Sequence, residues 1–200
     1  MAGSARPPRL TPELLAAAYC RGLFPMADDW GNIRWFDPDP RGILPLDAFH
    51  VPRRLAKTIR GGRFDVRFDR SFRAVMEACA APVAGRGETW ISAELVDAYE
   101  ALHCLGLAHS VETWQEGELV GGLYGVAIRG LFAGESMFSR VRDASKVALV
   151  HLVDRLRDAG FVLLDTQFLT SHLARFGCVE IPRTRYRQLL ARALAADARF

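Results

Sequence analysis

The 200-residue sequence has no run of about 18 apolar residues, the length that a membrane-spanning helix requires. Its first ten residues, MAGSARPPRL, lack the apolar core of a secretory signal, so nothing in them indicates export. Half of the residues are hydrophobic and 24% are charged, which is typical of soluble globular proteins. We therefore expect a cytoplasmic protein without a membrane partner, built as one domain or as a large domain with a small companion.

Cysteine is scarce, and its spacing shows no metal-binding pattern. The sequence contains no CxxC pair, and no cysteine–histidine cluster has the spacing of a zinc site. No motif near any cysteine favours a nucleophilic role. We expect no metal ion, and free, mostly buried thiols at Cys20, Cys79, Cys104 and Cys178.

Positive charge is concentrated in one segment, although the whole chain has a net charge of only +3. Residues 53–73 contain eight basic and two acidic residues, a net charge of +6, so the remainder of the chain carries −3. Such asymmetry indicates an anionic partner at one place on the surface. The eight basic residues are Arg53, Arg54, Lys57, Arg60, Arg63, Arg67, Arg70 and Arg73.

The start of this basic segment, residues 52–61, is predicted to be a helix with a proline at its beginning and a glycine at its end. Arg53, Lys57 and Arg60 share one face of that helix. Such a face is either a solvated surface or a site for nucleic-acid phosphates, and the pattern leaves both open. No aromatic residues are interleaved in the helix, which favours contact with a nucleic-acid backbone over reading of bases.

The second half of the chain alternates between predicted strands and helices. Three consecutive antiparallel strands are expected over 109–115, 119–128 and 131–138, because apolar runs are separated by the turns EGE and RG. A long helix over 143–160, capped by Asp143, follows them. The other predicted elements are helices over 11–22, 92–106, 171–177 and 184–198 and strands over 161–165 and 179–182.

This order of elements predicts an α+β fold with a GNAT-like acyltransferase domain over residues 81–200. Residues 11–80, in which short strands and turns precede the basic helix, would form a small N-terminal α/β accessory domain. Residues 1–10 are predicted to be disordered. No internal repeat or low-complexity segment interrupts the chain.

Three polar residues lie where buried strands are expected. Glu135 is on the third strand, within LFAGESMF, and Asp165 ends the apolar strand FVLLD two residues before Gln167. An ion pair of Glu135 with Arg140 or Lys146, and a helix cap at Asp165, are structural alternatives that stay open. Because side chains alternate along an extended chain, Asp165 and Gln167 can instead point into one cleft at a strand end. Two carboxylates and an amide there favour a site for a cation or an amine.

Large apolar residues accompany these polar positions. By spacing alone they are core residues, and Leu152 and Leu156 share one helix face. A flexible methionine beside a phenylalanine also suits a pocket for an apolar side chain. The set comprises Leu123, Phe132, Met137, Leu152, Leu156 and Leu164.

Other candidate motifs favour structural roles. His103, His109 and His172 have no serine or cysteine paired with them in a catalytic motif, so we expect them to be structural. GGLYG (121–125) lacks the lysine and the serine or threonine of a phosphate loop, and it lies within a predicted strand. We expect its glycines to allow close backbone approach or a bulge.

Ten short motifs follow one another over nearly the whole chain. They are AYCRGLFPM (18–26), RWFDPDPRGILP (34–45), TWI (89–91), AYEALHCLGLAHSVE (98–112), LVGGLYGV (119–126), FAGESMFS (132–139), ASKVAL (144–149), LDTQ (164–167), HLARFG (172–177) and EIPR (180–183). Each motif alone is weak, whereas the ordered set is highly specific. In this set the sequence closely resembles the bacterial leucyl/phenylalanyl-tRNA–protein transferases.

The resemblance implies an enzyme that moves Leu or Phe, and less readily Met, from its charged tRNA to the N-terminal amine of a protein beginning with Arg or Lys. The product carries a destabilising N-terminal residue and passes to the bacterial degradation machinery by the N-end rule. The partners would be Leu-tRNA, Phe-tRNA and such acceptor proteins, without a cofactor or a metal. The resemblance also implies a GNAT-like C-terminal domain with a small N-terminal domain.

The resemblance further assigns roles to residues. Asp165 and Gln167 match the family's catalytic pair, and Glu135 matches an acid of the same site. Trp90 matches the aromatic residue that borders the terminal adenosine of the tRNA, a region to which Met26 also belongs. The apolar set given above, from Leu123 to Leu164, matches the pocket for the Leu or Phe side chain. The residues that match the tRNA-binding surface are Arg53, Arg54, Lys57, Arg60 and Arg63.

Two positions depart from the family's pattern. Met26 stands where many relatives have tryptophan after FP, so we expect stacking on the adenosine to be weaker or different. Thr166 replaces the usual cysteine of DCQ. This replacement argues against a cysteine nucleophile and fits a reaction without a covalent enzyme intermediate.

Two other function classes compete with this interpretation. A GNAT N-acetyltransferase would hold the pyrophosphate of acetyl-CoA on a glycine-rich turn, but the corresponding stretch, FSRVRDASK, contains no glycine. A non-catalytic RNA-binding protein would explain the basic segment but would leave Glu135, Asp165 and Gln167 without a role.

Overall fold

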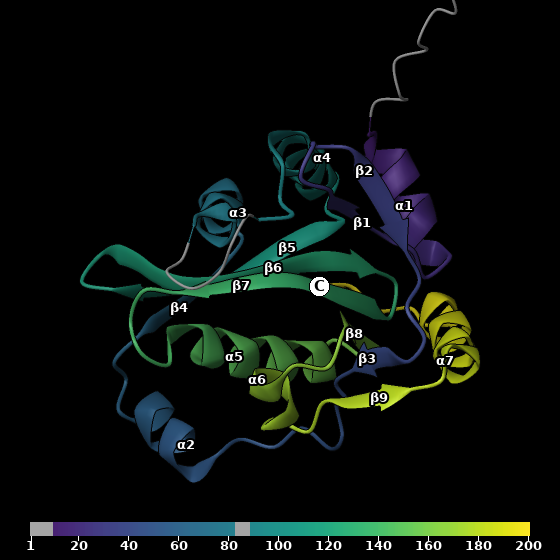
Figure 1. The fold of residues 1–200 in the computed structure, drawn as a ribbon. Coiled ribbons are helices and arrows are strands. Elements are labelled where there is room, and N and C mark those ends of the chain that lie inside the picture. The colour runs from purple at the N-terminus through teal and green to yellow at the C-terminus, as the bar shows by residue number, and fades with distance from the viewer. Residues whose placement is uncertain (1–9, 83–88) are drawn as a thin grey trace, which may run out of the picture.

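The computed structural model describes residues 10–82 and 89–200 (Figure 1). The predicted disorder of residues 1–9 lies outside the described residues. Leu10, the last residue of that predicted segment, is buried, and its N–H donates to Glu94 over 3.1 Å. Helix α1 then begins at Pro12, where the Thr11 hydroxyl accepts a hydrogen bond from the N–H of Leu14 and caps the first turn.

A seven-stranded sheet runs through the centre of the molecule in the order β4-β5-β6-β7-β8-β3-β9 (Figure 1). Its neighbouring strands are antiparallel except for β7 and β8, which are parallel. A separate two-stranded ribbon pairs β1 with β2. The strands are β1 Phe24–Ala27, β2 Ile33–Phe36, β3 Arg41–Ile43, β4 Asp65–Phe68, β5 Ala108–Gln115, β6 Glu118–Ile128, β7 Leu131–Ser139, β8 Leu163–Gln167 and β9 Val179–Ile181.

Helices cover both faces of this sheet (Figure 1). One core packs α1, α3 and α4 against one face, and a second core packs α5 against the other. A smaller third core lies beneath α7 at the end of the sheet. The helices are α1 Pro12–Cys20, α2 Arg53–Arg60, α3 Phe72–Ala80, α4 Ala93–Cys104, α5 Ala144–Asp158, α6 Ser171–Ala174 and α7 Arg183–Ala195.

The predicted three-strand meander is confirmed as β5, β6 and β7, and the glycines of GGLYG have the expected role. A Cβ atom on Gly125 would lie 2.3 Å from the carbonyl oxygen of Ala133, and one on Gly121 would lie 2.5 Å from the Cβ of Ala144. The same stretch carries an irregularity, because the register with β7 shifts between Tyr124 and Gly125. Small residues therefore let β7 and α5 pack closely on β6.

Strand β4 and helix α3, which lie in and beyond the basic segment, were not predicted from the sequence. Strand β4 pairs with β5, and β3 pairs with β8 and β9, so two strands from before residue 80 complete the central sheet. The prediction of mostly buried thiols is half right, because Cys79 and Cys178 are buried but Cys20 and Cys104 are exposed. Asp143 precedes α5 as predicted, but its side chain pairs with Lys146 and caps no backbone N–H.

Candidate active site

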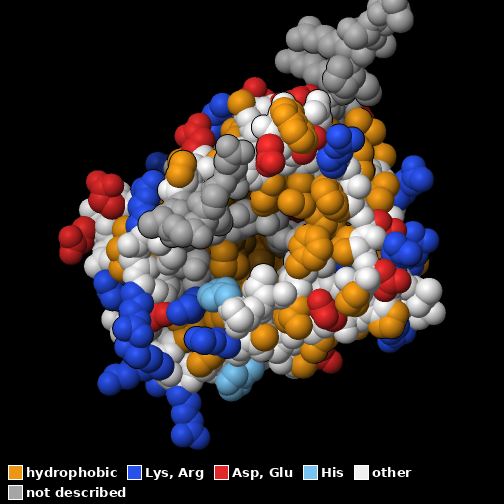
Figure 2. Space-filling view, in the orientation of Figure 1, with side chains coloured by type: hydrophobic (Ala, Val, Ile, Leu, Met, Phe, Trp, Pro, Cys, Tyr) orange, Lys and Arg blue, Asp and Glu red, His pale blue; other side chains and the backbone are white. Residues whose placement is uncertain are grey.

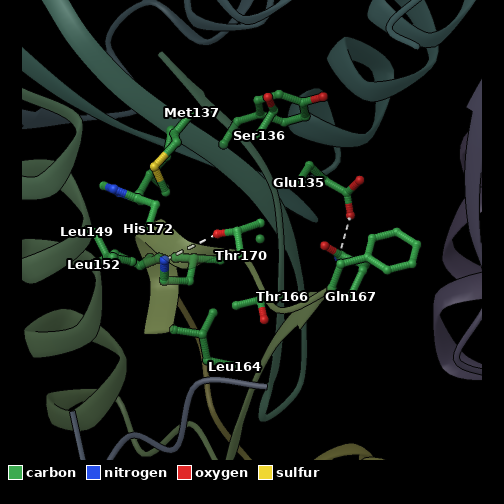
Figure 3. A pocket seen from close by; sticks show the side chains of 15 residues that line it. Glu135, Ser136, Met137, Leu149, Leu152, Leu164, Thr166, Gln167, Thr170 and His172 are labelled. Atoms are coloured by element: carbon green, nitrogen blue, oxygen red, sulfur yellow. Dashed lines mark hydrogen bonds between the residues drawn. The ribbon is translucent and has the colours of Figure 1, made fainter. Parts of the chain in front are cut away.

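A cavity of about 430 Å³ opens where β7 and β8 separate (Figure 3). The two strands pair over only three positions, the last of which joins Ala133 to Asp165. Beyond it, β7 continues to Ser139 along β6 alone, while β8 ends at Gln167. The opening lies at the strand ends, and α5 supplies its far wall through Leu149 and Leu152.

Glu135 enters this cavity because β7 has a bulge. Gly134 pairs with Gly125 and Ser136 pairs with Tyr124, so Glu135 is an extra residue with no partner on β6. Such a bulge turns a side chain out of the regular alternation of a strand. Glu135 therefore points away from the β6 ladder, toward α1 and α4.

Two tyrosines hold the Glu135 carboxylate. The Tyr19 hydroxyl of α1 donates to Oε1 over 2.7 Å, and the Tyr99 hydroxyl of α4 donates to Oε2 over 3.3 Å. The two hydroxyl oxygens also lie in contact with each other, and because each phenol has one proton to donate, this contact and the two bonds to an ionised Glu135 share two protons. Within the described residues, Arg140 and Lys146 bond elsewhere, to the Leu119 carbonyl and to Asp143, so the predicted alternative of an ion pair with Glu135 is wrong.

The Glu135 carboxyl is poised between its neutral and charged forms. Burial raises its pKa to about 8, the hydrogen bond from Tyr19 opposes that rise, and the nearby charge of Asp165 adds to it. The cation of Arg41 acts in the opposite direction. Burial thus favours the neutral carboxyl, and a cation brought beside it favours the charged form.

Asp165 does not line the cavity but forms a buried ion pair on its inner side. Arg41 of β3 donates to both carboxylate oxygens, over 2.9 Å and 2.6 Å, and both side chains are fully buried. The Tyr186 hydroxyl of α7 donates over 2.8 Å, and the N–H of Gln167 donates over 2.9 Å. Four donors converge on one carboxylate, which is the set that an ionised, buried acid requires. The predicted alternative of a helix cap at Asp165 is therefore wrong.

Gln167 lies in a strained turn that this carboxylate stabilises. Its φ angle is +57°, which is unfavourable for a residue other than glycine, and the N–H of Phe168 donates to the Thr166 carbonyl over 2.6 Å. The turn carries the Gln167 amide toward Glu135, and its Nε2 donates to Oε1 over 3.3 Å (Figure 3). Gly42 leaves room for the turn, because a Cβ atom there would lie 2.6 Å from the Phe168 backbone. Strain of this kind concentrates at functional sites.

The remaining wall is largely apolar, and four of the six predicted pocket residues line it: Leu123, Met137, Leu152 and Leu164. Phe132 and Leu156 are fully buried and lie in the core beneath α5 instead. Leu149 and Leu173 line the wall without having been predicted. Figure 3 shows this apolar side facing the polar pair of Glu135 and Gln167 across the cavity.

Polar groups on β7, β8 and α6 border the apolar wall. Ser136 and Thr170 were not singled out from the sequence, and Thr166 was noted only as the replacement of a cysteine. His172, for which a structural role was expected, lines the cavity. Burial lowers the pKa of His172, as do the charges of Lys146 and Arg175. The ring is therefore neutral at physiological pH.

Trp90 and Met26 both pack against the core between α1 and α4 and do not line the cavity. The N–H of Ala27 donates to the Trp90 carbonyl over 3.1 Å, which joins the β1 strand to the segment before α4. Both side chains are partly buried against that core. The hydrogen bond between Ala27 and Trp90 brings together the two segments that carry the residues predicted to border the adenosine.

The basic helix α2 presents its cations to solvent, while the buried Leu55 attaches it to the core. Figure 2 shows Lys and Arg side chains gathered to the lower left of the hollow, where Figure 1 places α2. Two arginines later in the segment are engaged: Arg67 pairs with Asp65, and Arg73 pairs with acids of α3 and α4. The basic residues of this segment that are exposed and have no ion pair to any described residue are Arg53, Arg54, Lys57, Arg60, Arg63 and Arg70.

Four side chains that build the site were not singled out from the sequence: Arg41, Tyr19, Tyr99 and Tyr186. Arg41 and Tyr19 lie within the motifs RWFDPDPRGILP and AYCRGLFPM. Their place in these motifs could have indicated that they are important. Their contacts could not be predicted from local pattern, because Arg41 is 124 residues from Asp165 and Tyr19 is 116 residues from Glu135. Among the described residues, no cluster of His, Cys, Asp or Glu could hold a metal ion, and no helix is long and apolar enough to cross a bilayer.

Comparison with known proteins places this architecture in a family. A family model described as leucyl/phenylalanyl-tRNA protein transferase matches residues 43–191, and a model of its N-terminal domain matches residues 9–39. The chain belongs to the leucyl/phenylalanyl-tRNA protein transferase family. These models meet near residue 40, whereas the boundary near residue 80 was inferred from the pattern alone and stays a prediction.

Relatives in the transferase family match the chain almost end to end. A leucyl/phenylalanyl-tRNA–protein transferase of Herpetosiphon aurantiacus is 60% identical over 96% of this chain and 98% of its own length. That of Phenylobacterium zucineum is 61% identical over 93% and 85%, respectively. A solved structure, "The structure of L-PGS from Bacillus licheniformis", matches 81% of this chain and 55% of its own with a TM-score of 0.42 and 16% identity. A likeness at that level does not establish a shared fold.

Because the pKa of Glu135 is elevated, we expect the free energy of unfolding of this protein to depend on pH. An acid whose pKa is about 8 in the folded state and near 4.5 in the unfolded state binds more protons when folded, so stability falls as pH rises between these values. Glu135→Gln, which stays neutral, should remove this fall. Urea unfolding at intervals from pH 5 to pH 8.5 measures the effect. Parallel stability curves for the two proteins would contradict the burial of this carboxyl.

Proposed function

We propose that this protein transfers Leu or Phe, and less readily Met, from aminoacyl-tRNA to the N-terminal α-amine of proteins that begin with Arg or Lys. Its family membership and the cavity that joins an apolar slot to an acidic end support this proposal. The product would carry a signal for N-end-rule degradation, and the place of the reaction would be the cytoplasm. We also propose that the fold is GNAT-like, since α5 crosses between two parallel strands that separate at their ends.

The slot would hold the Leu or Phe side chain of the esterified tRNA. Its walls are the side chains of Leu123, Met137, Leu152 and Leu164, and its volume of about 430 Å³ is in the usual range of small-ligand pockets. A β-branched side chain would fit this slot less well. Shape alone separates near-isosteric side chains by only ~1–3 kcal/mol, so the preference would be graded.

The reaction depends more on alignment of the amine with the ester than on general acid–base catalysis, because the ester is already activated. The unprotonated α-amine attacks the ester carbonyl, an amide bond forms, the bond to the ribose oxygen breaks, and the amine proton passes to that oxygen. A free α-amine has a pKa near ~8, so an appreciable fraction is neutral at physiological pH. Holding amine and ester together can contribute roughly 7–11 kcal/mol.

Gln167 and Glu135 would position the amine. Because the Gln167 Nε2 donates to Glu135, its carbonyl oxygen is left to accept a hydrogen bond from the attacking amine. The Glu135 carboxylate would attract the cationic acceptor. Asp165 would act through its bond to the Gln167 N–H, since its own oxygens are occupied by Arg41 and Tyr186.

A transfer assay tests the proposal. Radiolabelled Leu-tRNA or Phe-tRNA is mixed with the protein and with peptides that begin with Arg, Lys or Ala. Label should enter only the Arg and Lys peptides, and an N-acetylated Arg peptide should stay unlabelled because its α-amine is blocked. If the Ala peptide were labelled equally, the acidic end of the cavity would not be the site that selects the acceptor. Acetyl-CoA binding without transfer would support an acetyltransferase instead, and equal binding of charged and uncharged tRNA without transfer would support an RNA-binding protein.

Helix α2 would grip the tRNA backbone by charge alone. Arg54→Glu and Lys57→Glu should each raise the KM for Leu-tRNA about tenfold at low salt, and each should reduce the slope of log affinity against log salt by about 1. Arg192→Glu, an exposed arginine on α7, is the matched control and should change neither quantity. Equal effects of all three substitutions would mean that α2 has no special part in tRNA binding.

A further inference from the structure

Three aromatic rings form a continuous row that leads away from the polar end of the cavity. Phe168 follows Gln167 directly and lines the cavity. Its ring meets that of Phe24 edge to face at 5.8 Å, and Phe24 stacks on Phe36 at 5.8 Å. We call these three residues the aromatic strip. Figure 2 shows hydrophobic side chains gathered to the right of the hollow, away from the Lys and Arg side chains at its lower left.

The aromatic strip is rigidly held at its middle ring, while its two outer rings are open to solvent. Phe24 is 3% exposed, and the guanidinium of Arg41 lies 4.9 Å from the centre of its ring, so the cation that pairs with Asp165 also supports the strip. Phe36 and Phe168 on either side are 36% and 46% exposed. Exposed aromatic surface that is continuous with a reaction site is typical of a binding surface.

The charge around the aromatic strip favours a protein chain over the phosphate backbone of the tRNA. Residues 24–39 contain four aspartates and one arginine, a net charge of −3, and Arg183 and Arg187 of α7 pair with Asp37. This region therefore lacks the surplus of positive charge that a phosphate backbone requires, whereas α2 has it. A chain end that carries an α-amine and a basic side chain is compatible with it.

We propose that the aromatic strip binds the second or third residue of the acceptor protein and favours an apolar or aromatic side chain there. An extended chain rises ~3.4 Å per residue, so ~3 residues starting from an amine at Gln167 cover the two ring-to-ring steps. Because side chains alternate, one of the two residues that follow the N-terminal Arg or Lys faces the rings. This inference rests on the proposed transfer to such acceptors.

The rates of transfer to three peptides, measured at saturating Leu-tRNA, test the role of the aromatic strip. The peptides are Arg-Ala-Ala-Gly, Arg-Phe-Ala-Gly and Arg-Ala-Phe-Gly, and kcat/KM is measured for each. One of the two Phe peptides should exceed the Ala peptide about tenfold, which corresponds to ~1.4 kcal/mol. Phe36→Ala should bring that ratio close to one. Phe168→Ala, which truncates a half-exposed ring, should also bring the ratio close to one. It provides a second test of the strip in case Phe36→Ala does not fold.

Trp35→Ala is the matched control, because Trp35 is 37% exposed on the same strand, and its side chain points to the opposite side of the ribbon from Phe36. It should retain the tenfold ratio. Equal kcat/KM for all three peptides with the unaltered protein would overturn the inference. A raised KM for Leu-tRNA in Phe36→Ala, with the peptide ratio kept, would assign the strip to the tRNA end instead. Absence of transfer to any peptide would refute the proposed function itself.

Discussion

The buried ion pair between Arg41 and Asp165 is the constraint on which the rest of the site depends. It ties β3 to β8, and the same arginine donates to the Gly22 carbonyl at the end of α1 over 2.9 Å. Tyr186 of α7 completes the carboxylate's shell. Removing one partner of such a pair leaves an uncompensated buried charge, at a cost of about 3–5 kcal/mol. Segments from both ends of the chain are thereby fixed around one strand end.

From that strand end the geometry propagates outward. Asp165 accepts the N–H of Gln167 and so stabilises a turn that would otherwise be strained, and the turn sends the amide across to Glu135. Tyr19 and Tyr99 hold Glu135 from the opposite side. The apolar slot lies on the α5 side of these groups. An apolar side chain and a cationic chain end can therefore be bound next to each other without sharing a surface.

Local pattern predicted the elements of this fold well and the directions of its side chains less well. The meander and α5 follow from apolar runs and turn residues. The expectation that Asp165 and Gln167 share one cleft fails because the positive φ of Gln167 ends the strand alternation. The bulge at Glu135 changes the phase of β7 and brings Met137 to the same face of the sheet as Phe132, where Met137 lines the cavity and Phe132 is buried in the core. The contacts of Arg41 could not be predicted, because they join residues 124 positions apart.

In this mechanism Asp165 acts by holding Gln167 and not by touching the substrate. A double-mutant cycle on the single-turnover rate of transfer tests it most directly, with Asp165→Asn, Gln167→Ala and the pair measured at saturating Leu-tRNA and Arg peptide. Residues that act as one unit are strongly non-additive. Each single variant should lose about a hundredfold or more in rate, and the double variant should be no slower than the slower single variant. Losses that multiply in the double variant would show two independent roles and contradict the claim.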